Sequence, residues 1–182
     1  ALQKDFFEKR KELADAMVNS KEIIKEVSEE FYNITGRKYG LYEEYMLDDA
    51  EIGIIALNST AGTIKDVIDE LRKNGIKAGL LKPRTFRPLP WNEISLSLKN
   101  LKALAIMDKS DSINAYSGPL FSEITSAMYS SRVYVPTINF IYGLGGVDVT
   151  KRDIEKVFNK LENLSKTFRT DKTTYYLGID NI

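Results

Sequence analysis

The residues best suited to bind or transform a small molecule lie in turns that follow apolar segments. Ser59 and Thr60 belong to the small-residue turn NSTAGT at 58–63, which follows the apolar run IGIIAL at 52–57. A turn between a buried strand and a helix exposes backbone N–H groups, and the positive end of the helix dipole attracts anions there. The turn lacks the GxGxxG spacing and the GK[ST] ending of nucleotide-binding loops. We therefore expect either a phosphate or carboxylate site or an ordinary tight turn without a ligand.

Two arginines occupy a proline-rich loop. Arg84 and Arg87 lie in KPRTFRPLP at 82–90. Proline reduces the entropy lost when such a loop is fixed, so two guanidinium groups can be held ready for a carboxylate or a phosphate. The alternative is that they bind main-chain carbonyls or acidic side chains at a domain interface, and this is the interpretation that we favour.

An aspartate and a glycine cluster follow two further apolar runs. Asp108 ends the run LKALAIM at 101–107, and the carboxyl ends of strands are where ligands meet open α/β sheets. An aspartate at that position is also a common helix cap. Gly143, Gly145 and Gly146 allow close backbone approach by a ligand or another subunit, or form a tight turn before a helix. All these positions are candidates for an interface or an anion site.

Composition excludes several kinds of chemistry. The chain of 182 residues has no Cys and no His. Disulfides, thiolate nucleophiles, cysteine-ligated iron–sulfur clusters, typical zinc sites and Ser-His-Asp triads are therefore excluded, and Ser59 has no basic partner. Binding of Mg²⁺ or Ca²⁺ by carboxylates alone stays open, but no loop of the DxDxDG type marks such a site. We expect no catalytic residue and no metal site in this chain.

Charge and hydropathy limit the kinds of partner and the location that we expect for this chain. Lys+Arg and Asp+Glu are 26 each, so the formal net charge is zero and nothing favours a nucleic-acid or anionic-membrane partner. No apolar run reaches the roughly 20 residues of a membrane-spanning helix, and residues 1–20 are too charged for a signal peptide. We expect a cytoplasmic protein. Because the chain begins at Ala1 without Met, we expect a fragment or a processed chain.

The elements that position these residues follow from hydrophobic periodicity. Residues 4–33 carry apolar side chains at helical spacing, which predicts a long amphipathic helix that needs a partner surface in the following domain or in a domain absent from this sequence. Continuous apolar runs typical of strands buried on both faces lie at 52–57, 76–81, 101–107 and 136–142. Predicted helices alternate with them at 63–74, 91–100, 119–130 and 150–168. The fold class is therefore α/β, a three-layer sandwich with a mainly parallel sheet. The tail at 173–179 is either an edge strand or a segment that a partner orders.

Several motifs together resemble one family. They are YGLYEEY at 39–45, STAGT at 59–63, GIKAGLLK at 75–82, RPLP at 87–90, GPLFSE at 118–123 and YGLGG at 142–146. In order and spacing they are similar to the transketolase C-terminal-like domain, domain II, of the alpha subunit of pyruvate (2-oxoacid):ferredoxin oxidoreductases. The similarity covers most of residues 30–165, and the helix before residue 35 resembles the connection from the family's preceding domain.

The resemblance implies a division into a linker helix at 1–38, an α/β domain at 39–168 and a tail at 169–182. It also implies a holoenzyme, a pyruvate synthase, that cleaves a 2-oxoacid with thiamine diphosphate and Mg²⁺. That enzyme forms an acyl-coenzyme A and passes electrons through [4Fe-4S] clusters to ferredoxin. In the family these cofactors lie on other domains or subunits, so we expect this chain to bind none of them and to be inactive alone. Its expected role is to form interfaces with the remaining domains and subunits and to support the coenzyme A channel, with a homodimer as a further expectation.

The sequence departs from the family pattern in places. Asn58 stands where we expect Gly, Leu89 where we expect Phe, and Lys109 and Val147 where we expect Arg. The loss of two arginines weakens anion binding and is compatible with a paralogue acting on a different 2-oxoacid. A standalone ligand-binding or dimerisation module that reuses the fold is the alternative function.

Overall fold

The computed structural model describes residues 3–180 and divides into two compact units. Unit 1 comprises the chain up to Glu43 together with Pro83–Pro90, and unit 2 comprises Glu44–Lys82 and the chain from Trp91 onward. We describe each unit by itself.

A mainly parallel sheet is the centre of unit 2. Within residues 3–180 the strands lie in the order β1-β3-β2-β4-β5-β6. They span β1 (Tyr42–Tyr45), β2 (Ile52–Ala56), β3 (Ala78–Pro83), β4 (Ala103–Asp108), β5 (Thr137–Ile141) and β6 (Thr174–Tyr176). β2 pairs in parallel with β3 and β4, β4 with β5, and β5 with β6, so that Ile54 of β2 lies between Leu80 and Ala105.

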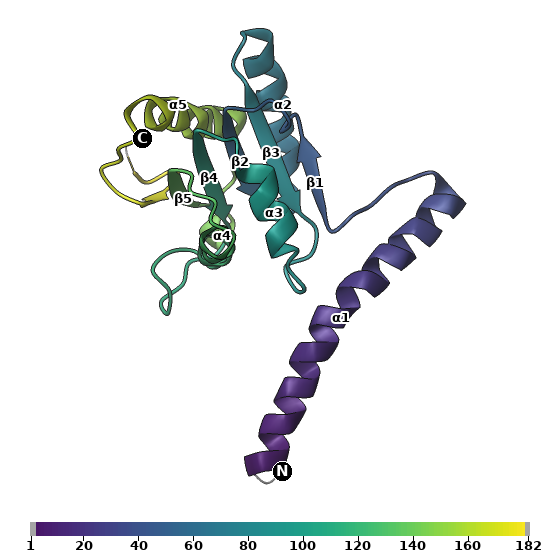
Figure 1. Ribbon diagram of the computed structural model, residues 1–182. Helices are drawn as coiled ribbons and strands as arrows, with labels where there is room; N and C mark the ends of the chain where they lie inside the picture. The colour runs from purple at the N-terminus through teal and green to yellow at the C-terminus, as the bar shows by residue number, and fades with distance from the viewer. Residues whose placement is uncertain (1–2, 181–182) are drawn as a thin grey trace. The chain divides into compact units, whose positions relative to one another are not determined.

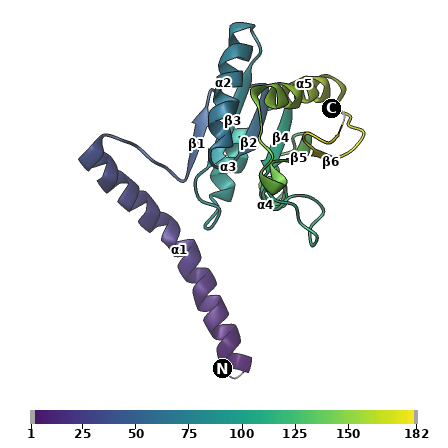
Figure 2. The ribbon, with the colours of Figure 1, turned by 180° about the vertical axis from the view of Figure 1, so that it is seen from behind.

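Helices cover both faces of this sheet. α2 (Thr60–Lys73) packs beside α5 (Lys151–Thr167), and α3 (Trp91–Leu98) packs beside α4 (Pro119–Ser130). Figures 1 and 2 show the first pair on one face of the sheet and the second pair on the other. Because both faces are covered, every residue of β2 and β4 is buried, which explains their continuous apolar sequence. The predicted α/β sandwich is confirmed.

The ends of the elements follow local chemistry. α4 spans 119–130, as predicted, with Pro119 in its first turn. Thr150 and Asp153 form a capping box at the start of α5, and Gly75 adopts φ +81° after the C-cap of α2. β3 continues through Lys82 and Pro83, which the sequence had suggested were loop. β1 was not predicted, because its sequence YEEY has no apolar run.

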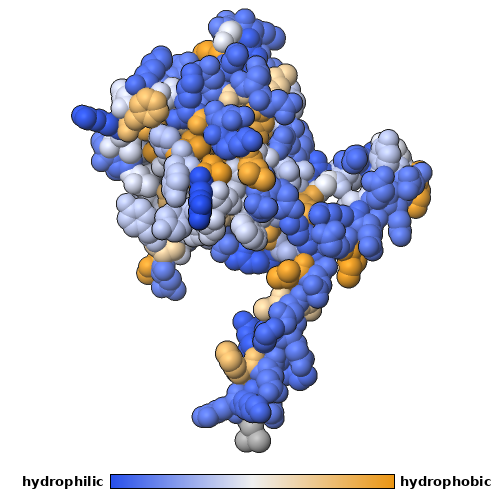
Figure 3. Space-filling view, viewed as in Figure 1, coloured by the Kyte–Doolittle hydropathy of each residue, from blue (hydrophilic) through white to orange (hydrophobic). Residues whose placement is uncertain are grey.

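Unit 1 is built around the long helix α1 (Gln3–Thr35). The helix ends at Thr35, and the following Gly36 adopts φ +69° and donates its N–H to the Tyr32 carbonyl at 2.8 Å. None of the described residues of α1 is buried. Figure 3 shows the molecule in the same view as Figure 1. Along α1, hydrophobic side chains (orange) lie among hydrophilic ones (blue). Among residues 3–180, no helix has the length and hydropathy needed to cross a membrane.

Candidate functional site

The carboxyl edge of the sheet gathers most of the candidate residues of unit 2. β2 lies between β3 and β4, so the strand order reverses at β2. Open α/β sheets bind ligands at such a topological switch point, outside the carboxyl ends of the strands. Tyr142, which directly follows β5, forms hydrogen bonds to two candidate residues at this edge. Its hydroxyl donates to Thr60 Oγ1 at 3.0 Å, and its N–H donates to the Asp108 carbonyl at 3.0 Å.

The turn before α2 has the geometry of a tight βα connection. Asn58, where the family pattern has Gly, adopts φ +58°, and the Ser59 side chain makes no capping hydrogen bond. The Ser59 carbonyl accepts the Gly62 N–H at 2.9 Å. The backbone of the turn and the start of the helix offer partial positive charge. Whether they bind an anion stays a prediction.

The Asp108 side chain points into the protein. Asp108 is 3% exposed, and its carboxylate accepts the N–H groups of Leu120 at 2.7 Å and Phe121 at 3.1 Å. Burial raises the pKa of this carboxyl group, and the hydrogen bonds partly offset that rise. A Cβ on Gly118 would lie 2.3 Å from the carboxylate, so only glycine fits there. Asp108 therefore caps the first turn of α4.

A buried amide completes this network, and the candidate list from the sequence missed it. Asn139 is 0% exposed and donates from Nδ2 to Asp108 at 2.8 Å and to the Ile106 carbonyl at 2.8 Å. Its Oδ1 accepts from Ser117 Oγ at 2.8 Å. Ser117 Oγ in turn shares a hydrogen bond with the Thr174 hydroxyl. The network joins β4, β5, β6 and the start of α4, and it leaves the amide of Asn139 fully satisfied.

The glycine cluster forms a short 3₁₀ turn, η1 (Leu144–Gly146), at the same edge. Gly143 adopts φ +64°, and a Cβ there would lie 3.1 Å from Lys109 Cε. Gly145 and Gly146 also have positive φ, but nothing lies within 4 Å of the place that a Cβ would take. The turn therefore leaves its backbone open to a partner, as the interface prediction requires, and the partner itself stays a prediction.

The two arginines belong to unit 1 and are partnered within it. The Arg84 guanidinium bonds the Glu43 carboxylate and lies 4.7 Å from the centre of the Tyr39 ring. Arg87 Nη1 donates to the Phe86 carbonyl at 2.8 Å. Contacts with a carbonyl and an acidic side chain are the kind that the interface interpretation expects, and a role in binding a free anion stays a prediction.

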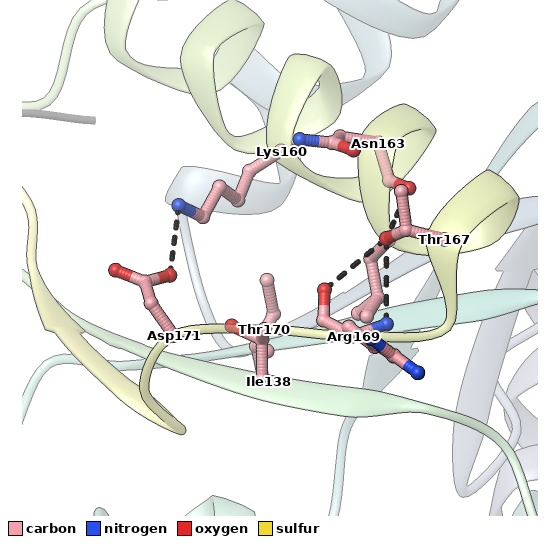
Figure 4. Close-up of a pocket in the computed structure, with 8 residues that line it drawn as sticks. Ile138, Lys160, Asn163, Thr167, Arg169, Thr170 and Asp171 are labelled. Carbon is pink, nitrogen blue, oxygen red and sulfur yellow. Dashed lines mark hydrogen bonds and ion pairs between the residues drawn. The ribbon is translucent and has the colours of Figure 1, made fainter.

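A cavity of about 440 Å³ lies between α5 and the segment before β6, and no motif in the sequence pointed to it. Figure 4 shows Lys160 pointing toward Asp171. The Lys160 ammonium lies 3.2 Å from the Asp171 carboxylate. The Tyr175 hydroxyl also donates to Asp171, and this bond contributes most to lowering the pKa of that carboxyl to about 2. The Lys160 ammonium is therefore paired with Asp171 inside the cavity, and Arg169 also lines it.

No metal or cluster site is present in the part of the chain that the structure describes. No group of three or more His, Cys, Asp or Glu side chains in residues 3–180 is placed to hold a metal ion. A [4Fe-4S] cluster requires cysteine thiolates, and the chain has none. The residues present therefore do not fit the clusters that the resemblance implies for the holoenzyme.

Solved structures place the fold in the transketolase-like class. The chain is similar to a split-gene transketolase, an inactive beta4 tetramer, with a TM-score of 0.53 and 16% identity over 71% of this chain and 45% of that one. It is also similar to the 2-oxoglutarate:ferredoxin oxidoreductase of Magnetococcus marinus, with a TM-score of 0.51 and 20% identity over 70% of this chain and 20% of that one. At these identities the likeness concerns the fold alone.

Sequence comparison identifies the family. The domain family described as pyruvate:ferredoxin oxidoreductase core domain II matches residues 50–154, and the chain belongs to this family. Pyruvate synthase subunit PorA of Methanosarcina barkeri is 42% identical over 145 residues, which are 79% of this chain and 36% of that subunit. The alpha subunit of an NADH-dependent phenylglyoxylate dehydrogenase from Aromatoleum evansii is 36% identical over 160 residues, 87% of this chain and 38% of that subunit. The chain thus spans less than half the length of these relatives, and the resemblance seen in the sequence is confirmed.

Proposed function

We propose that the chain serves as an accessory domain of a pyruvate (2-oxoacid):ferredoxin oxidoreductase alpha subunit and performs no chemistry alone. The observation that carries this proposal is the match to core domain II over residues 50–154. The polar groups of the chain support the non-catalytic part. Asp108 caps α4, the Tyr142 hydroxyl is engaged by Thr60, and Lys160 is paired with Asp171. Each is held in an internal contact rather than presented to a substrate.

The accessory role consists of forming interfaces and supporting the coenzyme A channel. The open backbone at Gly145 and Gly146 and the carboxyl edge beside it are the surfaces that we assign to this role. The division into a linker helix at 1–38, an α/β domain at 39–168 and a tail at 169–182 is part of the proposal.

The cofactors and partners are those of the holoenzyme. Thiamine diphosphate, Mg²⁺, [4Fe-4S] clusters and coenzyme A bind to its other domains and subunits, and ferredoxin receives the electrons. We further propose a cytoplasmic location and homodimerisation, and no nucleic-acid or membrane partner. Pyruvate is the first substrate to test, because PorA subunits of pyruvate synthases match this chain at 40% and 42% identity. Phenylglyoxylate is the second, because a phenylglyoxylate dehydrogenase subunit also matches.

A chimeric enzyme tests this proposal. The matched segment of Methanosarcina barkeri PorA is replaced by this chain, and the chimera is assembled with the other subunits of that enzyme. We expect reduction of methyl viologen that depends on both a 2-oxoacid and coenzyme A. The same enzyme with the segment deleted is the control and should be inactive. An assembled chimera that is inactive with pyruvate, 2-oxoglutarate and phenylglyoxylate would contradict the proposal.

The second candidate function is a standalone ligand-binding module. The turn at 58–63, whose Ser59 side chain is uncommitted to capping, favours it. A ligand that binds only the native state raises the melting temperature by mass action, so thermal unfolding with inorganic phosphate, diphosphate and coenzyme A separates the two functions. A shift of several degrees that is lost in the Gly62→Pro variant would favour the module.

A further inference from the structure

One face of α1 carries an exposed apolar stripe. At 100° per residue its members fall within about a third of the helix circumference. They are Leu13, Met17, Ile23, Val27, Phe31 and Ile34, and they are between 38% and 83% exposed. Such a stripe is the pattern of a helix that packs on an apolar surface, because most helical stability in proteins comes from burying that face.

The opposite side of the helix carries most of the charged side chains, together with the exposed Phe7, Val18 and Tyr32. Lys11 pairs with Asp15 and Lys25 with Glu22, all on the side away from the stripe. The stripe itself is free of charge from Leu13 to Ile34. This contrast means that one face, and not the whole helix, is shaped for a partner.

Helices of unit 2 itself cover both faces of its sheet. α2 and α5 cover one side of it and α3 and α4 cover the other, and the side chains of β2 and β4 are buried on both. The apolar core of this unit is therefore complete with its own helices.

A second copy of α1 is a poor match as well. The heptad register with Met17 and Phe31 at core positions also places Arg10 and Ser20 there. The other core positions are apolar: Leu13, Ile24, Val27 and Ile34. A two-stranded coiled coil would thus bury a guanidinium and a hydroxyl at its seam. The stripe is also wider than the two positions per heptad that such a seam uses.

The relatives point to the occupant. PorA of Methanocaldococcus jannaschii matches 176 residues, which are 96% of this chain. Because α1 alone has 33 residues, the match must include most of this helix. The matched region is only 43% of that subunit. More than half of a PorA chain thus lies outside the match and is available to cover the helix.

We propose that the apolar stripe of α1 docks into an apolar groove on that unmatched part of the alpha subunit. Helix-in-groove packing of this kind uses anchors at spacings of three, four and seven residues, as the stripe provides. α1 is then a fixed interdomain strut of the enzyme. This inference rests on the proposed function, because it takes its partner from the same alpha subunit.

Amide hydrogen exchange tests it, with a matched pair of substitutions. Val27 lies in the stripe and is 57% exposed, whereas Val18 lies on the opposite side of α1 and is 68% exposed. Exchange of the α1 amides is measured in the isolated chain and in Methanocaldococcus jannaschii PorA whose matched segment is replaced by this chain. We expect exchange to be slowed ~100-fold or more in the chimera. Val27→Glu should remove most of this protection, and Val18→Glu should leave it intact.

Other results would overturn the inference. Equal exchange in the two settings, or equal loss of protection in both variants, shows that the stripe does not dock there. Protection already present in the isolated chain identifies a different occupant: a second copy if sedimentation depends on concentration, and another part of this chain if it does not. If the chimera does not assemble, calorimetric titration of the isolated chain with the separately expressed unmatched part of PorA replaces it, and no binding is a negative answer.

The same variants separate this inference from the proposed function. Viologen reduction without protection of α1 supports the enzyme role and overturns the docking. Protection of α1 without activity supports the docking and counts against the enzyme role.

Discussion

The sheet of unit 2 and the helix of unit 1 contain the same types of apolar residue, but these are buried in the sheet and exposed in the helix. Ile54 in β2 is 0% exposed, whereas Ile34 in α1 is 83% exposed. In β2 and β4 every side chain is buried beneath helices encoded by the same chain. In α1 the apolar stripe is complete but none of its residues is buried. An apolar pattern thus shows that a surface is suited to packing against another. It does not show whether the partner surface belongs to the same chain.

The largest effect should come from emptying the core of the sheet. Ile54→Ala removes a fully buried side chain from the middle of β2. The lost burial and the remaining cavity should lower the free energy of unfolding by about 2–5 kcal/mol. Urea denaturation of the isolated chain measures this. A loss below 1 kcal/mol would mean that this core is far looser than its burial indicates.

The buried polar network should follow. Asp108→Asn keeps the size of the side chain but replaces one acceptor oxygen with an NH₂ group that faces other donors. Leaving buried donors without acceptors should cost about 1–3 kcal/mol in unfolding free energy. Asp148→Asn, at an exposed position, is the matched control and should change little. Equal stability of the two variants would show that the network does not hold the start of α4.

The cap of α5 should contribute somewhat less. The Thr150 hydroxyl accepts the Asp153 N–H at 3.3 Å, and the Asp153 carboxylate accepts the Thr150 N–H at 3.0 Å. Thr150→Ala breaks one half of this capping box and should cost about 1 kcal/mol in urea denaturation. Restoration by Thr150→Ser, which also caps helices, would tie the loss to the hydroxyl. A Ser variant as unstable as the Ala variant would instead attribute it to packing of the methyl group.

Local patterns predicted the body of unit 2 well and its polar interior poorly. The apolar runs located the central strands because a strand buried on both faces has no polar positions to blur the pattern. Asn139 stood in such a run, and a buried amide must find partners, so this residue was a readable signal that the sequence interpretation passed over. The contacts of Asn139 could not be predicted, because they depend on tertiary structure. The pairing of β4 with β5 brings Asp108 to Asn139, and the segment before α4 brings Ser117. The cavity beside Lys160 depends likewise on where the tail returns.

The tail of unit 2 should respond to acid. The pKa of Asp171 is lowered to about 2, chiefly by the hydrogen bond from Tyr175, so the folded state favours the ionised carboxylate. A lowered pKa gives stability that is present above the ordinary value near 4 and is lost as the pH falls toward 2. In Asp171→Asn this part of the acid sensitivity should disappear. Melting temperatures from pH 5 to pH 2 measure it, and identical slopes for wild type and variant would contradict the assignment.

The smallest effect should be at the exposed end of α1, where the comparison with the core is sharpest. Ile34→Ala repeats the substitution made at Ile54, but the removed atoms are 83% exposed. We expect a change within ~0.5 kcal/mol in the isolated chain, and the higher helix propensity of Ala offsets part of any loss. In the full alpha subunit the same substitution should become costly, because the docked side chain would leave a cavity. A large loss of unfolding free energy already in the isolated chain would mean that the stripe of α1 packs against another part of this same chain. The contrast between the two units would then not hold.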